Sequence, residues 1–397
     1  MSLPLNPSAF PIVTNTKCRI RHVVAGSSGN NISPQNTRTS STNSIVTSPT
    51  KQVVPKTSAN QNTTPNHVTK AASAAVAVPA DTVEAATIET EKVAPIETSN
   101  KLELQRMRNG GFWNRKWHMM DVTHLLLTVG AHGLALSAPF VFNAGAVWVA
   151  FVLSLMTGIS KTLGYHRLLS HKSFKLPKWL EYCFTYCGCH FGQRDPIFWV
   201  SVHKNHHKYT DQERDPHSPR EGFWFSHFGW YYYHEYLAMK PEIGVYSNVP
   251  ELKAQWFYRF LHDTYVWHII GLGVLLYFVG GYPYLAWGMG ARMVMANHFS
   301  FLVSPVCHLW GGRPYNTSDT STNNGILALL TFGEGWHNNH HAIPKSARHG
   351  LEWWQFDSTW GVIKFLEMVG LATDVYIPTE ADKKRTKLSL LTNAASI

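Results

Sequence analysis

The chain has 397 residues, of which 15% are charged and 13% aromatic, whereas about 25% of the residues of an ordinary soluble domain are charged. This composition argues against a purely soluble enzyme and points towards a membrane. Residues 1–80 contain seven basic and no acidic residues, so only +3 of the formal net charge of +10 belongs to the rest of the chain, which excludes a basic nucleic-acid-binding surface. Five cysteines without paired spacing argue against a disulfide framework.

The first 80 residues have the composition of an organelle transit peptide. They contain 22 Ser or Thr and no Asp, Glu, Trp or Tyr, which is typical of transit peptides and of chloroplast ones in particular. The alternative is a plain disordered tail, although such a tail usually contains acidic residues. Residues 81–112, with six acidic side chains, are interpreted as a linker. The folded domain is predicted at residues 113–378 and a C-terminal tail at residues 379–397.

Two long stretches with almost no charge predict four transmembrane helices. Residues 122–160 contain no Asp, Glu, Lys or Arg, and residues 264–312 contain only Arg292. A helix crosses the bilayer core in about 20 residues, so each stretch is long enough for two helices joined by a turn, at Asn143 and at Gly280–Pro283 respectively. The predicted spans are residues 122–142, 143–163, 262–280 and 282–304.

The predicted fold is an all-α membrane protein with two helical hairpins and a helical, His-rich cap on one side. Both hairpin turns lack charge, whereas basic residues flank the other ends of the spans. This pattern places both chain termini and residues 161–263 on the same side of the membrane. Residues 177–189 and 353–369 are amphipathic and are predicted to lie at the membrane surface. We interpret Cys183, Cys187 and Cys189 in the first of these segments as packing residues.

Eight histidines fall in three dense motifs, HRLLSH from His166 to His171, HKNHH from residue 203 and HNNHH from residue 337. Positions i, i+3 and i+4 share one face of an α-helix, so each of the last two motifs aims three imidazoles in one direction. The first pair is five residues apart and cannot share an α-helical face, so we place it at the frayed end of the second span, near Gly164. Six isolated histidines are interpreted as surface or core residues with local partners: His190, His217, His227, His234, His298 and His349.

The number and type of these ligands indicate two metal ions. One zinc ion takes four ligands, so eight or more histidines imply two ions. Imidazole suits iron, copper and zinc alike, but zinc hydrolases also need a carboxylate base, and no His-Glu-x-x-His motif is present. Iron with open coordination positions activates dioxygen. Since all three motifs lie just outside predicted spans, we expect a lipid substrate that enters from the bilayer and is oxidised at a C–H bond.

These motifs resemble the three histidine boxes of the membrane fatty-acid desaturases, over about residues 113–378. Two longer segments, DQERDPHSPREGFWFSHFGW at 211–230 and GEGWHNNHHA at 333–342 with SARHGLEWWQFD after it, are similar to plant acyl-lipid and acyl-CoA desaturases related to the delta-9 enzymes. Within that group the chain is most similar to the plastid members, which desaturate palmitate on monogalactosyldiacylglycerol at delta-7. The resemblance implies a desaturase that contains two iron ions.

The resemblance also implies the ligands and their neighbours. The ninth ligand of the family, in a His-Leu-Trp-Gly-like segment, matches His308. In animal acyl-CoA desaturases an Asn four residues earlier holds a metal-bound water; this chain has Ser304, which would hold such a water loosely or through a second water. Side chains that match Gln193, Trp199 and Ser300 shape the bend of the substrate tunnel in those enzymes, which have Thr in place of Ser300. The implied iron ligands are His166, His171, His203, His206, His207, His308, His337, His340 and His341.

Two further polar residues are candidates outside these motifs. Asp215, in Asp-Pro-His, either orients a ligand imidazole or is a turn residue before proline. Arg292 lies ten residues into the fourth predicted span. An ionisable group at that depth is either functional or one half of a buried ion pair.

The predicted reaction removes two hydrogens from adjacent methylenes of an acyl chain, with dioxygen as the oxidant. No His-Pro-Gly-Gly haem segment is present, so the electrons must come from a separate protein. In a chloroplast membrane the expected donor is ferredoxin, and in the endoplasmic reticulum it is a cytochrome of the b type. The alternatives are a hydroxylase on the same diiron scaffold, a zinc-dependent membrane hydrolase, and a metal transporter, whose histidines would lie within the spans.

Overall fold

The computed structural model describes residues 103, 105–107, 115–240 and 246–394. The chain divides into two compact units, residues 1–86 and 87–397, and every described residue belongs to the second unit. The predicted transit peptide and most of the predicted linker therefore lie outside the described residues.

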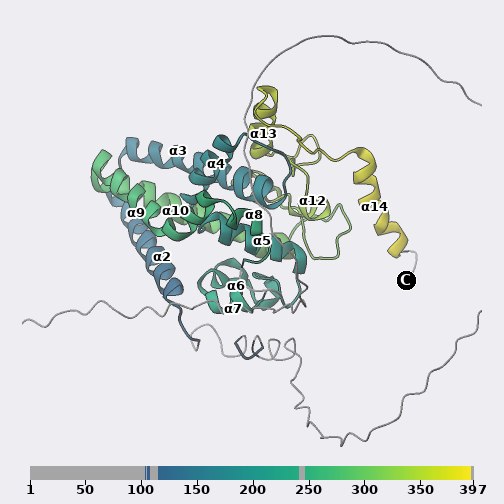
Figure 1. Ribbon diagram of the computed structural model, residues 1–397, viewed down its shortest axis with the longest axis horizontal. Helices are drawn as coiled ribbons and strands as arrows, with labels where there is room; N and C mark the ends of the chain where they lie inside the picture. The colour runs from purple at the N-terminus through teal and green to yellow at the C-terminus, as the bar shows by residue number, and fades with distance from the viewer. Residues whose placement is uncertain (1–102, 104, 108–114, 241–245, 395–397) are drawn as a thin grey trace, which may run out of the picture. The chain divides into compact units, whose positions relative to one another are not determined.

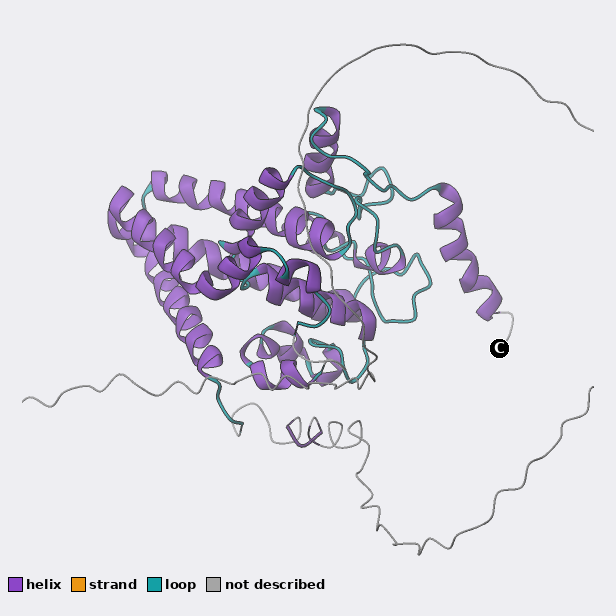
Figure 2. Cartoon of the chain, in the orientation of Figure 1, coloured by secondary structure: helices purple, strands orange, loops and turns teal. Residues whose placement is uncertain are grey.

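The described part of the chain consists of helices and loops and contains no β-strand, as Figure 2 shows. This confirms the prediction of an all-α protein. The α-helices are α2 (Met119–Ser137), α3 (Ala144–Ser160), α4 (Lys178–Cys189), α5 (Pro196–Tyr209), α6 (Phe223–His227), α7 (His234–Met239), α8 (Pro250–Lys253), α9 (Trp256–Leu285), α10 (Arg292–Leu309), α11 (Gly325–Leu330), α12 (His337–Ala342), α13 (Ser358–Met368) and α14 (Glu380–Ala394). Two π-helical segments, η2 (Lys161–Ser170) and η5 (Ala286–Ala291), and three short 3-10 turns, η1 (Ala138–Val141), η3 (Pro219–Glu221) and η4 (Gly229–Tyr232), complete the set.

Among the described residues, three helices are long and apolar enough to cross a membrane: Met119–Val141, Ala144–Ser170 and Trp256–Leu309. The third runs for 54 residues through α9, η5 and α10. Its backbone leaves the helical region at Gly280, with φ −152°, and at Gly281, with φ 70°. A positive φ is open to glycine and costly for other residues. This break lies between the third and fourth predicted spans, and the number of four spans stays a prediction.

The connection between α2 and α3 is set by local hydrogen bonds and by proline. Pro139 lies in η1, directly after α2. Asn143 then caps α3, because its Oδ1 accepts a hydrogen bond from the backbone nitrogen of Ala146 at 2.9 Å. Such a cap satisfies one of the N–H groups that the first turn of a helix leaves unpaired. The chain therefore reverses within a few residues and needs no charged side chain to do so.

The apolar helices lie beside one another, with α10 in contact with α2 and α3, and α3 in contact with α9 (Figure 1). Large apolar side chains project from them, and Leu126, Phe140 and Phe278 are 65%, 88% and 81% exposed. An apolar surface of this kind is a liability in water and favourable in hydrocarbon. The structure thus supports a membrane environment for these helices.

The two segments predicted to be amphipathic contain α4 and α13. Trp179 of α4 and Phe365 and Met368 of α13 are exposed, whereas Ile363 and Leu366 are buried in a core cluster beneath them. Each helix therefore has one apolar face in the protein and further apolar side chains on its surface. Their contact with a membrane stays a prediction.

Two polar helices, α5 and α12, carry the second and third histidine motifs. Asp195 begins α5, since its carboxylate accepts a hydrogen bond from the backbone nitrogen of Phe198 at 3.0 Å, and Pro196 occupies the first helical position. The turn before α12 requires glycine at position 333, where φ is 108° and a Cβ would lie 2.4 Å from Asp357. Packing of α5 against η2 and of α12 against α10 brings the three motifs together.

We expect Gly290→Ala to destabilise the helical core. A Cβ at Gly290 would lie 2.5 Å from the backbone nitrogen of Ala135, so α2 would have to move away from η5. Overpacking of this kind costs about 1–3 kcal/mol of unfolding free energy, which lowers the midpoint of thermal unfolding of the protein in detergent. The control Gly271→Ala, where the new Cβ meets nothing within 4 Å, should unfold at the wild-type temperature. Equal midpoints for both variants would contradict this packing.

Candidate metal centre

Nine buried or half-buried histidines converge in two groups, and within each group the ring nitrogens lie within 4.8 Å of one another. These nine are the residues that the resemblance implied as ligands. The first group contains His166, His171, His203, His207 and His340, and the second contains His206, His308, His337 and His341. The sequence did not indicate how the nine would divide.

The first motif lies on a π-helix, and the prediction of a frayed helix end was wrong. Residues 161–170 form η2, and the backbone nitrogen of His171 donates to the carbonyl of His166 at 3.2 Å. A π-helix pairs residues five apart, so this spacing brings the two side chains to the same side, with ring centres 5.0 Å apart. In an α-helix, side chains five residues apart point in different directions. The wider π-helix makes His166 and His171 neighbours.

The two HxxHH-type helices each contribute to both groups. On α5, His203 and His207 join the first group while His206 joins the second. On α12, His340 belongs to the first group, and its neighbours in the motif belong to the second. Since each of these helices has ligands in both groups, the distance between the groups is fixed by two rigid elements.

The ring nitrogens in each group face one another at hydrogen-bonding distance. Nε2 of His171 lies 2.8 Å from Nε2 of His203, Nε2 of His207 lies 2.8 Å from Nε2 of His340, and Nε2 of His308 lies 3.1 Å from Nε2 of His337. The buried Nε2 atoms of His206 and His341 have no hydrogen-bond partner in the described part of the chain. A set of imidazole nitrogens that face inwards in this way is an arrangement that can bind a metal ion.

Carboxylates hold the opposite ring nitrogen of four of these histidines. Nδ1 of His206 donates to Asp215 at 3.0 Å, Nδ1 of His341 to Asp319 at 2.9 Å, and Nδ1 of His308 to Asp211 at 3.3 Å; Nδ1 of His166 contacts Glu334. A neutral imidazole that donates from Nδ1 carries its lone pair on Nε2. The carboxylates thus select the tautomer that presents Nε2 to a metal, and the donor set fits iron or another metal with imidazole ligands.

The charges of these carboxylates are stabilised within the site. Burial alone would raise the pKa of Asp211, but hydrogen bonds from His308 and Thr320 outweigh it and lower the pKa to about 2. Burial also opposes ionisation of Asp215 and Asp319, and the His206 and His341 imidazoles respectively hold their pKa well below the usual range. All three side chains are therefore negative at neutral pH.

Most of the imidazoles outside the apolar helices are neutral at the same pH. Burial, followed by the charge of neighbouring imidazoles, lowers the pKa of His203, His207 and His340 well below the usual range. For His206 burial acts in the same direction, but Asp215 outweighs it and raises the pKa. A neutral imidazole is the form that binds a metal, and a bound cation would displace the additional proton from His206.

A buried ionic group anchors one end of the site and was missed by the sequence analysis. Arg167 donates to both oxygens of Asp357, at 2.9 and 3.0 Å, and to Glu334 at 3.2 Å. This bidentate geometry fixes the guanidinium, which fixes the Glu334 carboxylate against His166. Glu334 lies three residues before the third motif. Its partners His166 and Arg167 are more than 160 residues away in the sequence, so no local spacing indicated its role.

Two histidines that the sequence analysis set aside lie at the site. His349 is only 1% exposed, its ring centre is 4.4 Å from that of His340, and neither ring nitrogen has a hydrogen-bond partner among the described residues. His349 is therefore a core residue and not a surface one, because the loop after α12 folds back onto the first group, and its Nδ1 lies 3.5 Å from Oε1 of Glu334. The ring of His217 lies 4.3 Å from that of His206.

Comparison with known proteins identifies the family of this chain. The fatty acid desaturase family matches residues 146–373. A delta-9 acyl-lipid desaturase from Arabidopsis thaliana is 48% identical over 299 residues, which cover 75% of this chain and 97% of the relative. The chain belongs to the fatty acid desaturase family.

Other relatives carry different regiochemical names. The chloroplastic palmitoyl-monogalactosyldiacylglycerol delta-7 desaturase of Arabidopsis thaliana is 53% identical over 275 residues, which cover 69% of this chain and 74% of the relative. An acyl-CoA C20 delta-5 desaturase from Anemone leveillei is 52% identical over 274 residues, which cover 69% of this chain and 87% of the relative. Identity of this level thus accompanies three double-bond positions and different acyl carriers.

In this family member, Ser304 is joined to the second histidine group through His217. Its Oγ lies 2.8 Å from Nδ1 of His217, donates to the carbonyl of the same residue at 3.0 Å, and lies 3.1 Å from Oγ of Ser226. The hydroxyl therefore has protein partners of its own, and it holds His217 against His206.

The three residues implied to shape a substrate tunnel lie together beside the histidines. Oε1 of Gln193 accepts hydrogen bonds from Nε1 of Trp199 and from Oγ of Ser300, both at 3.3 Å. All three line a cavity of about 80 Å³ that also borders His203, His206 and His337. Both histidine groups therefore border this cavity, which is large enough for a small part of a substrate.

Arg292 is 2% exposed and is bound by neutral acceptors. Its guanidinium donates to the carbonyls of Gly288 and His190, at 2.5 and 2.9 Å, and to Oγ1 of Thr157 at 3.2 Å. Among the described residues no carboxylate lies within 4.0 Å of it, so a buried ion pair is not present there. The side chain thus connects α10 with α3 and with the end of α4 through hydrogen bonds.

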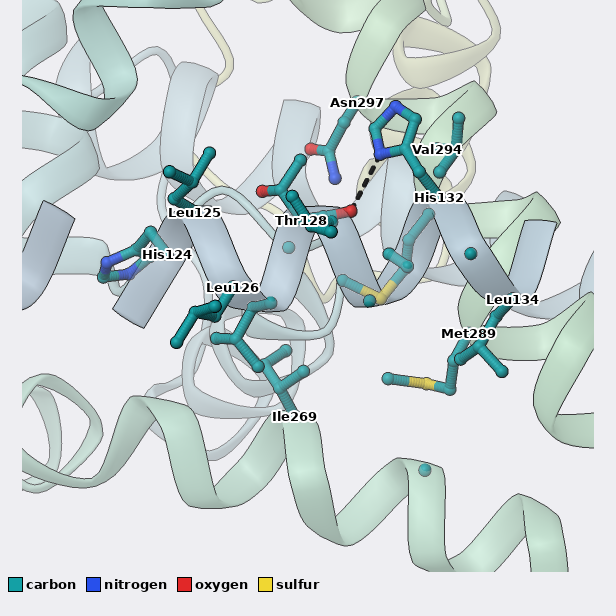
Figure 3. Close-up of a pocket in the computed structure, with 18 of the residues that line it drawn as sticks. His124, Leu125, Leu126, Thr128, His132, Leu134, Ile269, Met289, Val294 and Asn297 are labelled. Carbon is teal, nitrogen blue, oxygen red and sulfur yellow. Dashed lines mark hydrogen bonds between the residues drawn. The ribbon is translucent and has the colours of Figure 1, made fainter. Parts of the chain in front are cut away.

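A large apolar groove lies between α2 on one side and α9, η5 and α10 on the other. It has a volume of about 1390 Å³, and Figure 3 shows Leu126, Ile269 and Met289 on its walls and Thr128, His132 and Asn297 among its few polar residues. Phe301 lines both this groove and the 80 Å³ cavity beside the histidines. Phe301 therefore separates the groove along the long helices from the cavity beside the histidines.

We expect Asp319→Asn to weaken metal binding at the second group. The neutral amide would be a poorer acceptor for Nδ1 of His341, and loss of such an outer partner typically lowers metal affinity about 10–100-fold. The measurement is the iron retained by purified protein after dialysis against increasing concentrations of chelator. The control Asp374→Asn removes an exposed carboxylate that pairs with Lys175 and should retain iron like the wild type. Identical retention curves for the two variants would refute a supporting role for Asp319.

Proposed function

We propose that this protein is a dioxygen-dependent fatty-acyl desaturase, which introduces a cis double bond into a saturated acyl chain of a membrane lipid. The observation that carries this proposal is the convergence of nine imidazoles, in a member of the fatty acid desaturase family, beside a cavity that adjoins an apolar groove. The family accounts for the reaction class, and the cavity accounts for access of hydrocarbon to the histidines.

Each histidine group would hold one iron ion, with five ligands in the first and four in the second. Two irons with open coordination positions would supply the activation of dioxygen. The protein's own contribution is to orient the imidazoles through Glu334, Asp211, Asp215 and Asp319, and to exclude water by burying them. Trp199 and Gln193 would hold one stretch of acyl chain beside the histidines, which fixes the methylenes that react.

The proposed substrate is a saturated chain esterified to a membrane lipid, with palmitoyl-galactolipid at delta-7 as the first choice and delta-9 as the second. The printed names of the plant relatives support both positions. The groove along α2, α9 and α10 supports access from the bilayer, since its walls are almost entirely apolar. A separate protein would deliver the electrons, and a polar hollow of about 340 Å³ lined by His171, His207 and His341 offers it a path to the site.

Four membrane spans in two hairpins account best for the long helices. A continuous helix of 54 residues would extend for roughly 80 Å, whereas the hydrocarbon core is about 30 Å thick. The non-helical backbone at Gly280 and Gly281 divides this stretch into two parts of spanning length. The proposed topology then places both chain termini and the histidine helices on the side with the basic residues.

A chloroplast membrane is the proposed location, with ferredoxin as the donor, and the endoplasmic reticulum with a cytochrome of the b type is the alternative. The chloroplastic relative and the acid-free composition of residues 1–80 support the first.

We expect residues 1–80 to carry a fluorescent reporter into chloroplasts. The same residues with six Ser or Thr replaced by Asp or Glu serve as the control. A reporter that stays in the cytosol with the natural sequence would rule out the plastid location.

We expect His206→Ala to abolish product formation while the protein still accumulates in membranes, because the change removes one proposed ligand and leaves the apolar helices unaltered. The host should lack desaturases of its own but make galactolipids, and fatty acids would be analysed in each lipid class together with bound metal. His268→Ala is the matched control, since its contacts lie on α9 and α4, away from both histidine groups.

The products separate the proposal from its rivals. Monounsaturated chains with bound iron support the desaturase, hydroxylated chains would identify a hydroxylase on the same scaffold, and bound zinc with released fatty acid would identify a hydrolase. Product from His206→Ala at the wild-type level would show that the second histidine group is not needed.

A further inference from the structure

A buried lysine borders the cavity beside the histidines. Lys161, at the junction of α3 and η2, is 6% exposed. Its ammonium donates to Oγ of Ser300 at 3.0 Å and lies 4.7 Å from the centre of the Trp199 ring. Among the described residues no carboxylate lies within 4.0 Å of the ammonium, so an ion pair does not explain its burial. The proposed mechanism also assigns no role to this charge.

Lys161 lies between two cavities. One is the 80 Å³ cavity that borders both histidine groups, and the other has a volume of about 220 Å³. Three residues line both: Lys161, Ser300 and Glu334. The contact between the ammonium and Ser300 therefore lies at the boundary between the two cavities, where Lys161, the first residue of η2, contacts α10.

The second cavity has the lining expected of a binding site for hydrocarbon. Its walls include Phe151, Phe191, Phe299, Leu330 and Phe332. The guanidinium of Arg292, which also borders it, is bound by neutral acceptors of the protein. Without the side chain of Lys161, an acyl chain that passes the histidines would find apolar space in which to continue.

We propose that Lys161 ends the acyl-binding passage and so limits the length of chain that fits beyond the reacting methylenes. This inference rests on the proposed function, because it requires an acyl chain in the 80 Å³ cavity. The side chain of Lys161 occupies the space that further methylenes would need. Methylenes that displaced the ammonium from Ser300 would also leave a buried cation without its acceptor, which is unfavourable. The hydroxyl of Ser300 and the face of Trp199 hold the ammonium in the closed position.

The test is the chain-length profile of the products. Wild type and variants would be expressed in the galactolipid-producing host and supplied with saturated fatty acids of different lengths. We expect Lys161→Ala to raise the ratio of C18 to C16 monounsaturated products about 10-fold or more, since pockets typically discriminate by about that factor for each methylene. Lys161→Arg keeps the bulk and the charge and should retain the wild-type ratio.

A second substitution, on α10, fills the new space. Ala296 lines the 220 Å³ cavity and does not line the smaller one. Ala296→Leu should leave the wild-type ratio unchanged but reverse the shift when combined with Lys161→Ala. A changed ratio for Ala296→Leu alone would overturn the proposal even if Lys161→Ala does not accumulate, because the acyl chain would already reach that cavity.

The remaining outcomes are distinct. An active Lys161→Ala with the wild-type ratio, or a Lys161→Arg that shifts like Lys161→Ala, would overturn the role of Lys161. Absence of any desaturated product from the wild type would instead contradict the proposed function itself.

Discussion

The structure depends on the convergence of nine imidazoles whose ring nitrogens face one another in two groups. Two imidazole nitrogens that face each other can share at most one proton, and burial keeps water from satisfying the others. The Nε2 pairs at 2.8–3.1 Å and the unpartnered Nε2 atoms of His206 and His341 are therefore an arrangement that bound cations would stabilise. A fold that assembles such a site needs strong constraints elsewhere, and the packed helices and buried carboxylates around the histidines provide them.

The carboxylates perform two tasks at once. Asp211, Asp215 and Asp319 fix the tautomer of their histidines, and their negative charge offsets the charge that a metal would bring into a buried site. Arg167 binds the Glu334 carboxylate that contacts His166, and it holds Glu334 and Asp357 in one buried ionic group. Removal of one member of such a group leaves an uncompensated charge, which is far more costly than the absence of the whole group.

The apolar part of the protein and the polar site meet at a few residues. Phe301 lines both the large groove and the 80 Å³ cavity. Ser300, next to it in the chain, lines both the 80 Å³ cavity and the 220 Å³ cavity. None of the nine clustered histidines lines the groove. Ser300 and Phe301 of α10 thus border the proposed acyl passage, whereas the clustered histidines come mainly from η2, α5 and α12. Lys161 of η2 and Trp199 of α5 border the same cavity, so the helices that carry the histidines also shape the space beside them.

The sequence alone determined the helical class, the position of the apolar helices and eight of the converging histidines, because these follow from local composition and from spacing within short motifs. His308 was implied only by the resemblance to the desaturases. His203, His206 and His207 share a helical face whatever surrounds them. Only the tertiary structure decided how the nine histidines divide into two groups, because each group takes members from segments that are up to 174 residues apart. It also turned the first motif into a π-helix, buried His349, and gave Glu334 and Asp319 their partners. These features arise from packing between distant segments, which no local pattern encodes.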